Sequence, residues 1–175
     1  MNPNRPSLAG VVGVAIFAAY VAAGQLLSQD GWVPILDSAN LALHEAGHPL
    51  TGIFSDRLSV YGGTLFQLLF PAAALAHFLR RREMAGSGVS LVWLGESLLN
   101  VARYMSDARS QLLPLVGGGE HDWTEIFSRW GVLTADTRIA RFTALVGWIL
   151  IIGTLAWLAR AWWRDTRQQD ASIDF

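Results

Sequence analysis

Long apolar runs separated by short polar segments dominate the chain. A transmembrane helix needs about 20 consecutive, mostly apolar residues, and the longest runs approach or reach that length. We therefore predict an all-α fold, a polytopic helical membrane bundle of about four spans. The expected spans cover residues 8–27, 60–79, 89–104 and 139–158.

The first run could instead be a signal peptide, because Arg5 precedes it and the small residues Ala22-Ala23-Gly24 stand near its end. Since further apolar runs follow, we favour an uncleaved first span. Residues 1–168 are expected to form a single integral membrane domain, and the polar residues 169–175 are expected to form a disordered tail.

Composition agrees with the membrane class and narrows the chemistry. Hydrophobic residues make up 52% of the chain and charged residues 15%. A net charge of −1 gives no argument for nucleic acid as a partner, so the expected partner is the lipid bilayer. The chain has no cysteine, so a metal would have to be held by His, Asp, Glu or water. Such ligand sets are typical of open catalytic zinc sites rather than closed structural ones.

One segment between the first two spans carries the pattern His44-Glu45-x-x-His48. On a helix, residues four apart lie one turn apart on the same face. Two imidazoles placed in this way can bind one Zn²⁺, and the intervening glutamate can act as general base toward the water on the metal. We therefore predict that His44 and His48 are metal ligands and that Glu45 is catalytic. The alternative is a pair of helix histidines satisfied by hydrogen bonds.

The helix that carries this motif is unusual because polar residues recur along one face. Such a stripe should face other protein or a water-filled cavity when it lies within a membrane protein. Pro49 is expected to kink or tighten the helix just after His48. The stripe consists of Asp37, Asn40, His44, His48 and Thr51, and Asp37 or Ser38 is expected to cap the helix.

Arginine positions predict the orientation of the bundle. The cluster at 80–82, the C-terminal arginines from Arg160 onward and Arg5 all favour the cytoplasmic side of the membrane. All three fit only if the motif segment enters and leaves from the outer face. The motif helix should therefore be re-entrant or tilted rather than a full span.

A second polar face occurs on the third expected span, where Glu96, Asn100, Tyr104 and Asp107 follow one another at helical spacing. Acidic groups on a membrane helix are costly without partners. Asp107 could supply a third metal ligand, or it could pair with Arg103 or Arg109. For Glu96 we favour hydrogen bonds between helices.

The glycine-rich loop that follows leads to His121, which is another candidate ligand. Asp122 and Glu125 have the spacing of a capping box, so Asp122 is expected to cap a helix rather than to bind a metal. This helix should be amphipathic, and it should lie on the membrane surface or cover the site. Its apolar face comprises Trp123, Ile126, Phe127 and Trp130.

Three stretches together resemble a known kind of protein: His-Glu-Ala-Gly-His at 44–48, Gly-Gly-Thr-Leu-Phe-Gln-Leu-Leu-Phe-Pro at 62–71, and Tyr-Met-Ser-Asp-Ala-Arg at 104–109 with Gly-Gly-Glu-His-Asp-Trp at 118–123. They resemble a family of small, largely uncharacterised prokaryotic HExxH membrane proteins. That family looks like distant relatives of site-2-protease-type intramembrane zinc metalloproteases. The resemblance implies His44 and His48 as zinc ligands, Glu45 as the base, and Asp107 as the third ligand.

Two functions are therefore expected as alternatives. The first is an integral membrane zinc metallohydrolase, a peptidase acting on a membrane or membrane-adjacent polypeptide. His44, His48 and Asp107 would hold Zn²⁺, with His121 as a competing or additional ligand, and Glu45 would be the general base. The second is a non-enzymatic metal-binding membrane protein, such as a sensor, carrier or assembly factor, in which Glu45 is dispensable.

Overall fold

The computed structural model describes residues 6–116 and 120–173, and every regular element within these ranges is helical. Six α-helices follow one another, with one short 3-10 turn before the last. They are α1 (Leu8–Leu27), α2 (Leu36–Gly52), α3 (Asp56–Arg80), α4 (Met84–Ser106), α5 (Asp122–Arg129), η1 (Leu133–Ala135) and α6 (Asp136–Ile173). The prediction of an all-α fold is confirmed for these residues.

In the part of the chain that the structure describes, three helices are long and apolar enough to span a membrane: α1, α3 and the greater part of α6. They correspond to three of the four expected spans. The fourth, α4, has 23 residues but buries polar side chains such as Ser90, Glu96 and Ser97, which make it less apolar than the others. A crossing by α4 therefore remains a prediction, as does a re-entrant α2.

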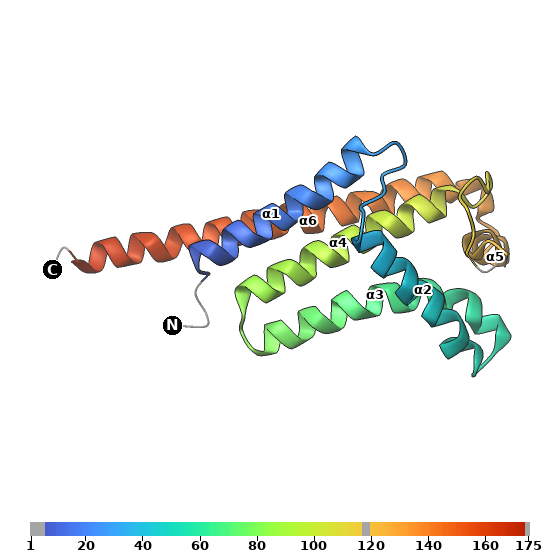
Figure 1. Ribbon diagram of the computed structural model, residues 1–175, viewed down its shortest axis with the longest axis horizontal. Coiled ribbons are helices and arrows are strands. Elements are labelled where there is room, and N and C mark those ends of the chain that lie inside the picture. Colours follow the sequence, from blue (N-terminus) through green and yellow to red (C-terminus); the bar gives the residue numbers. More distant parts are fainter. Residues whose placement is uncertain (1–5, 117–119, 174–175) are drawn as a thin grey trace.

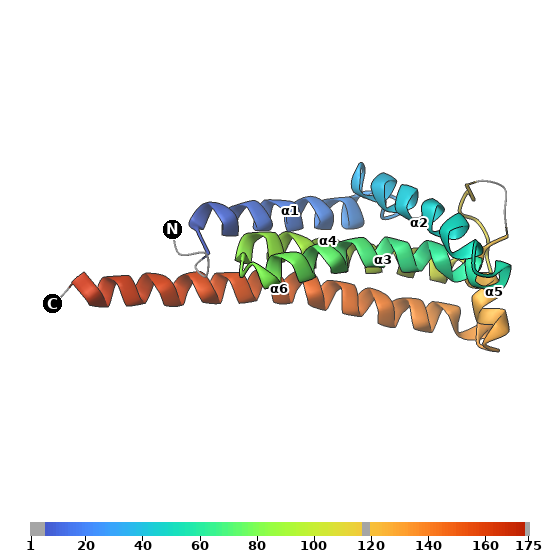
Figure 2. The ribbon, with the colours of Figure 1, turned by 90° about the horizontal axis from the view of Figure 1, so that it is seen from below.

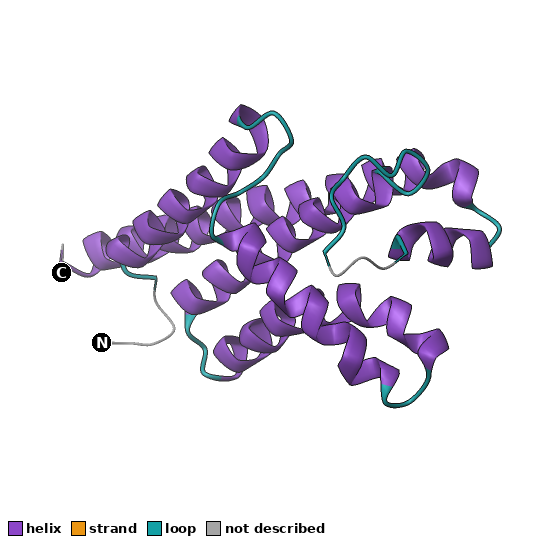
Figure 3. Cartoon of the chain, turned by 45° about the vertical axis from the view of Figure 1, so that its right-hand side comes forward, coloured by secondary structure: helices purple, strands orange, loops and turns teal. Residues whose placement is uncertain are grey.

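The long helices α1, α3, α4 and α6 run side by side along the longest axis of the molecule (Figures 1 and 2). The turn between α3 and α4, which carries the arginines at 80–82, lies toward the same end as the C-terminus. The opposite end holds α2 and α5, with α2 crossing obliquely (Figure 3). Arg5 lies outside the described residues.

Close helix packing in this bundle depends on glycines. A Cβ on Gly95 of α4 would lie 2.8 Å from the carbonyl oxygen of Gly147 of α6, and a Cβ on Gly47 of α2 would lie 2.1 Å from that of Gly62 of α3. Since no side chain larger than hydrogen fits there, the backbones can approach closely, as small residues allow in membrane helices. The contact between Gly47 and Gly62 fixes α2, and with it the histidine motif, against α3.

The start of α2 and the end of α6 differ in detail from the expectations. Neither Asp37 nor Ser38 caps α2: the helix begins after Ile35, and Asp37 accepts instead from the backbone N–H of Val33 at 2.7 Å. Pro49 lies within α2, which continues to Gly52, and the expected kink after His48 stays a prediction. Residues 169–173, which were expected to begin a tail, lie at the C-terminal end of α6 as the structure describes it. Residues 174 and 175 lie outside the described part.

Candidate metal centre

Two histidines of α2 and one aspartate of α5 converge at the end of the bundle where α2 and α5 meet. The Nε2 atom of His44 lies 2.9 Å from Oδ2 of Asp122, and Nε2 of His48 lies 3.3 Å from the same oxygen. The two imidazole rings are 5.0 Å apart, centre to centre. Both rings therefore point one nitrogen at a common position, as the motif predicts for neighbours one helical turn apart.

The spacing of these three atoms suits a zinc ion. Zn²⁺ binds histidine nitrogen and carboxylate oxygen at about 2.0–2.2 Å in a tetrahedron, which places ligand atoms about 3.3 Å from one another. All three donor atoms lie within 4.8 Å of one another, and no other such group of at least three His, Asp or Glu side chains occurs among residues 6–116 and 120–173. Two histidines and one carboxylate form a typical catalytic zinc set, which leaves the fourth position open.

Two further contacts orient the histidine rings. The Nδ1 atom of His48 lies 2.9 Å from the carbonyl oxygen of Ser59, at the start of α3. Such a bond fixes the proton on Nδ1 and leaves Nε2 free to bind a metal. The ring of His44 lies directly against Gly63, where an added Cβ would come within 2.5 Å of Nε2. The pair Gly62 and Gly63 thus serves helix packing and makes room for His44.

The packing of α5 explains how Asp122 reaches the histidines. Trp123, Ile126 and Phe127 are buried against the end of α4, where they contact a cluster that includes Met105. Asp122 is the first residue of α5, and its backbone N–H donates to the hydroxyl of Tyr104 at 3.1 Å. The apolar face of α5 therefore anchors the helix to the bundle and directs its first side chain toward α2.

The expected role of Asp122 as a helix cap is wrong. His121 is the capping residue of α5, because its Nδ1 accepts from the backbone N–H of Thr124 at 3.3 Å. Glu125, the supposed partner in a capping box, instead pairs with Arg129 at 2.7 Å. The side chain of Asp122 is left to interact with the two histidines.

Protons and a metal ion would compete for the nitrogen and oxygen atoms of these three groups, because a histidine must be neutral to bind a metal. The hydrogen bond with Asp122 raises the pKa of His48, against the opposing effect of partial burial. Burial by itself would raise the pKa of Asp122, but hydrogen bonds and charge interactions with His44 and His48 hold that pKa below its usual value. Asp122 is therefore kept as a carboxylate, which is the form that binds a metal.

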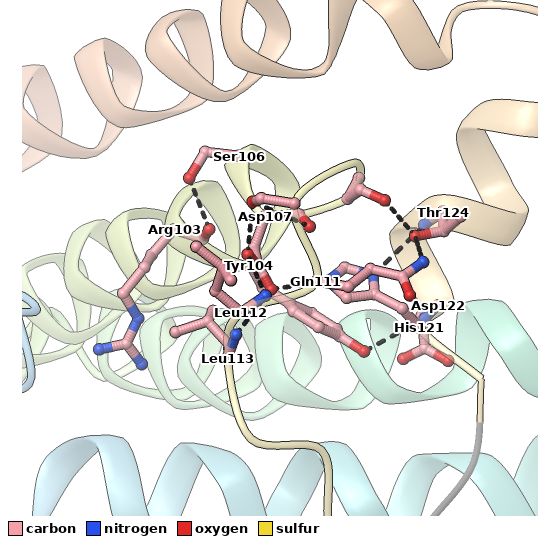
Figure 4. A network of polar contacts seen from close by, with 12 residues as sticks. Arg103, Tyr104, Ser106, Asp107, Gln111, Leu112, Leu113, His121, Asp122 and Thr124 are labelled. Atoms are coloured by element: carbon pink, nitrogen blue, oxygen red, sulfur yellow. Dashed lines mark hydrogen bonds and ion pairs between the residues drawn. The ribbon is translucent and has the colours of Figure 1, made fainter.

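The two other candidate ligands, Asp107 and His121, are not brought to this group. Asp107 lies just after α4 and accepts from Ser110 and from the backbone N–H groups of Leu112 and Leu113, at 2.6–3.0 Å (Figure 4). Its remaining neighbour is His121, whose Nε2 is 3.5 Å from Oδ2 of Asp107. The carboxylate of Asp107 is thus used to hold the loop that follows α4.

The arginines considered as partners of Asp107 pair elsewhere. Arg109 binds Asp136 at the start of α6, at 2.8 Å. Arg103 lies over the ring of Trp32, 4.9 Å from its centre, and 3.9 Å from Asp37. Asp107 therefore organises its own loop rather than forming an arginine ion pair.

Asp37 and Asn40, at the N-terminal part of the polar stripe on α2, face other protein, as expected. The Asn40 amide donates to Glu96 at 2.6 Å, the Asn100 amide donates to Asp37 at 2.6 Å, and the Gln67 amide of α3 donates to Asn100 at 2.9 Å. Asp37, Asn40 and Glu96 are fully buried. These bonds join α2, α3 and α4 and set the position of the histidine motif along α4.

Comparisons with known protein families, with curated proteins and with solved structures found no match. No family is therefore assigned to the chain, and the resemblance described from the sequence remains a prediction.

The sequence favoured Asp107 and His121 as further ligands, whereas the group that the structure brings together contains Asp122 beside His44 and His48. His121 and Asp122 are neighbours; the capping-box spacing with Glu125 favoured a cap for Asp122, and its place in a loop favoured a ligand role for His121. The structure instead makes His121 the cap of α5 and places Asp122 beside His44 and His48. The decisive factor is the rotation of α5 about its own axis, which is set by the burial of Trp123 and Phe127, and no local signal reports it.

Proposed function

We propose that this protein is an integral membrane zinc metallohydrolase, and specifically a peptidase. The observation that carries the proposal is the convergence of His44, His48 and Asp122 at zinc-ligand spacing. A zinc ion at this position would supply a Lewis acid that lowers the pKa of a water molecule and polarises a carbonyl group. Three protein donors leave a position for that chemistry.

Glu45 is proposed as the general base. It lies between the two histidines in sequence and, together with Tyr104, it lines both cavities that border the centre. A carboxylate at this place can take a proton from the attacking water and pass it to the leaving amine. Asp122 replaces Asp107 as the third ligand in the proposal. In this respect the proposal departs from the resemblance to site-2 proteases, which implies Asp107 as the third ligand.

The location of the centre fits a polypeptide substrate in or beside a membrane. His44 and Asp122 are buried, but His48 keeps about a quarter of its side chain exposed. The centre lies at the end of the bundle away from the arginine-bearing turn. We assign this end, which holds the centre, to the outer face of a prokaryotic cell membrane. Water and an unfolded segment of a substrate could enter from that face.

A Glu45→Gln variant tests the assignment. The protein is purified in detergent with zinc, and zinc content and cleavage of unfolded casein are measured together. We expect Glu45→Gln to retain zinc and to lose cleavage by at least about a hundredfold, the contribution typical of a general base. Glu83→Gln, at the far end of the bundle, is the matched control and should retain both.

The second candidate function, a metal sensor, carrier or assembly factor without enzymatic activity, uses the same three donors and does not need Glu45. It predicts that zinc is bound but that the wild-type protein cleaves no polypeptide. It also predicts that Glu45→Gln leaves every measured property unchanged. Zinc bound without cleavage by the wild type would therefore favour this alternative over the peptidase.

A further inference from the structure

Two cavities border the candidate metal centre on different sides. The first has a volume of about 220 Å³ and lies between α2, α4 and the loop after α4. The second has a volume of about 320 Å³ and reaches the surface beside His48, Ser59 and Asp122. Glu45, Tyr104, Leu115 and Val116 line both cavities, so the two spaces adjoin at the proposed catalytic residue.

The walls of the two cavities differ in chemistry. The first is lined mainly by apolar side chains, among them Trp32, Leu41, Leu113 and Pro114, while the charged residues Asp30 and Arg103 form part of its lining. Its amides, Gln67 and Asn100, already bind each other. The second cavity presents the carboxylates of Glu120 and Asp122 and the backbone of Ser59. An extended chain that crosses Glu45 would therefore place an apolar residue on one side and polar groups on the other.

We infer that the first cavity, between Leu41 of α2 and Leu113 of the loop, is a specificity pocket for one branched aliphatic or aromatic side chain of a polypeptide substrate. The inference rests on the proposed function and adds a substrate class to it. The size is suitable, because an apolar cavity of about 150 Å³ in another protein accepts benzene. Burial of a leucine-sized side chain there would favour binding by a factor of about ten or more.

Two small hydroxamates test this pocket without knowledge of the natural substrate. Hydroxamates bind catalytic zinc or cobalt. Acetohydroxamate carries only a methyl group, whereas isocaproyl hydroxamate carries a leucine-like chain. Affinities are read from the visible absorption of the cobalt-loaded, full-length protein in detergent. We expect isocaproyl hydroxamate to bind about tenfold or more tightly than acetohydroxamate.

Matched variants show which cavity causes the preference for isocaproyl hydroxamate. Leu41→Gln makes the first cavity polar, and it should remove the preference while leaving acetohydroxamate affinity unchanged. Val60→Gln changes a residue that lines only the second cavity, and it should keep the preference. Both variants are measured in the same detergent, so partition of the probe into micelles affects them equally. Leu113→Gln provides a second test of the first cavity should Leu41→Gln fail to fold.

The outcomes separate this inference from the proposed function. Equal affinity of the wild type for both hydroxamates, or a preference that survives both Leu41→Gln and Leu113→Gln, would overturn the pocket assignment while leaving the metal centre intact. Failure of cobalt or of acetohydroxamate to bind at all would instead overturn the proposed function and the pocket with it.

Discussion

His44 and Asp122 are 78 positions apart in the chain, yet Nε2 of one lies 2.9 Å from Oδ2 of the other. Each residue is nearly excluded from solvent, with 6% of its surface exposed. The contact links α2, which is fixed by glycine packing on α3, to α5, which is fixed by aromatic packing on α4. The proposed metal centre therefore depends on two separate helix contacts, that of α2 with α3 and that of α5 with α4, and each can be perturbed separately.

Gly63→Ala should disturb the centre through His44 alone. An alanine Cβ would lie 2.5–2.7 Å from atoms of the His44 ring, so the ring must move. We expect zinc affinity to fall by about ten- to a hundredfold, which is the effect typical of losing a contact that orients a ligand. The measurement is competition for zinc with a chelator of known affinity.

Gly13→Ala is the control for this variant, because a Cβ at Gly13 meets nothing within 4 Å. It should leave zinc affinity unchanged and should stabilise α1 slightly, by about 0.5–1 kcal/mol. Equal zinc affinity in wild type and Gly63→Ala would show that the position of the His44 ring is not critical for binding.

Asp107→Asn should weaken the loop after α4 without removing the metal. An asparagine offers one oxygen where the carboxylate accepts bonds on both, so the bond from Leu112 or from Leu113 is lost. We expect a loss of about 1–3 kcal/mol of unfolding free energy, in the range for bonds to charged groups. Thermal unfolding in detergent gives the change, and zinc content should equal that of the wild type. Glu120→Gln, an exposed change in the same loop, should alter neither the unfolding free energy nor the zinc content.

The effect of Asp107→Asn should also depend on pH. Burial would raise the pKa of Asp107, but the bonds from Ser110, Leu112 and Leu113 hold it below the model-peptide value of 3.8. A carboxyl group with a lowered pKa in the folded state stabilises the fold above its unfolded value, and this contribution is lost as the pH falls through the folded value. The difference between wild type and Asp107→Asn should therefore be full at neutral pH and should shrink below pH 3.8. A difference that stays constant across that range would contradict the assigned role.

Asn40→Leu should destabilise the junction of α2 and α4. Asn40 is fully buried, donates to Glu96 and accepts from the indole N–H of Trp93 at 2.9 Å. Leucine would leave both partners unsatisfied inside the protein, at a cost of about 1–3 kcal/mol for each buried polar group. Ser38→Leu, an exposed change on the same helix, is the control. Unfolding free energies that fall equally in the two variants would argue against the network.

Local patterns in the sequence account for much of this structure. Runs of apolar residues predicted three helices that the structure shows to be long and apolar enough to cross a membrane, because span length is a property of contiguous residues. Helical spacing likewise predicted that Asn40, His44 and His48 share a face. Both signals act within one or a few turns of a helix.

The third donor could not be predicted in this way. Its identity depends on which side of α5 packs against α4, and that is decided by contacts such as Phe127 with the end of α4 rather than by the residues around Asp122. The sequence analysis selected Asp107 and His121, which the structure instead places 3.5 Å from each other. Both are close in sequence to the elements that form the centre, but their side chains are engaged in holding the loop and capping α5.

The most direct test of the account is the zinc content of the purified protein, measured side by side in wild type, Asp122→Asn and Asp107→Asn. The account predicts about one zinc ion per chain in wild type and Asp107→Asn, as expected for a single site with three protein donors. It predicts loss of most of that zinc in Asp122→Asn, because an amide is a poor zinc ligand. Zinc that is retained in Asp122→Asn and lost in Asp107→Asn, or wild-type protein that binds no zinc, would contradict it.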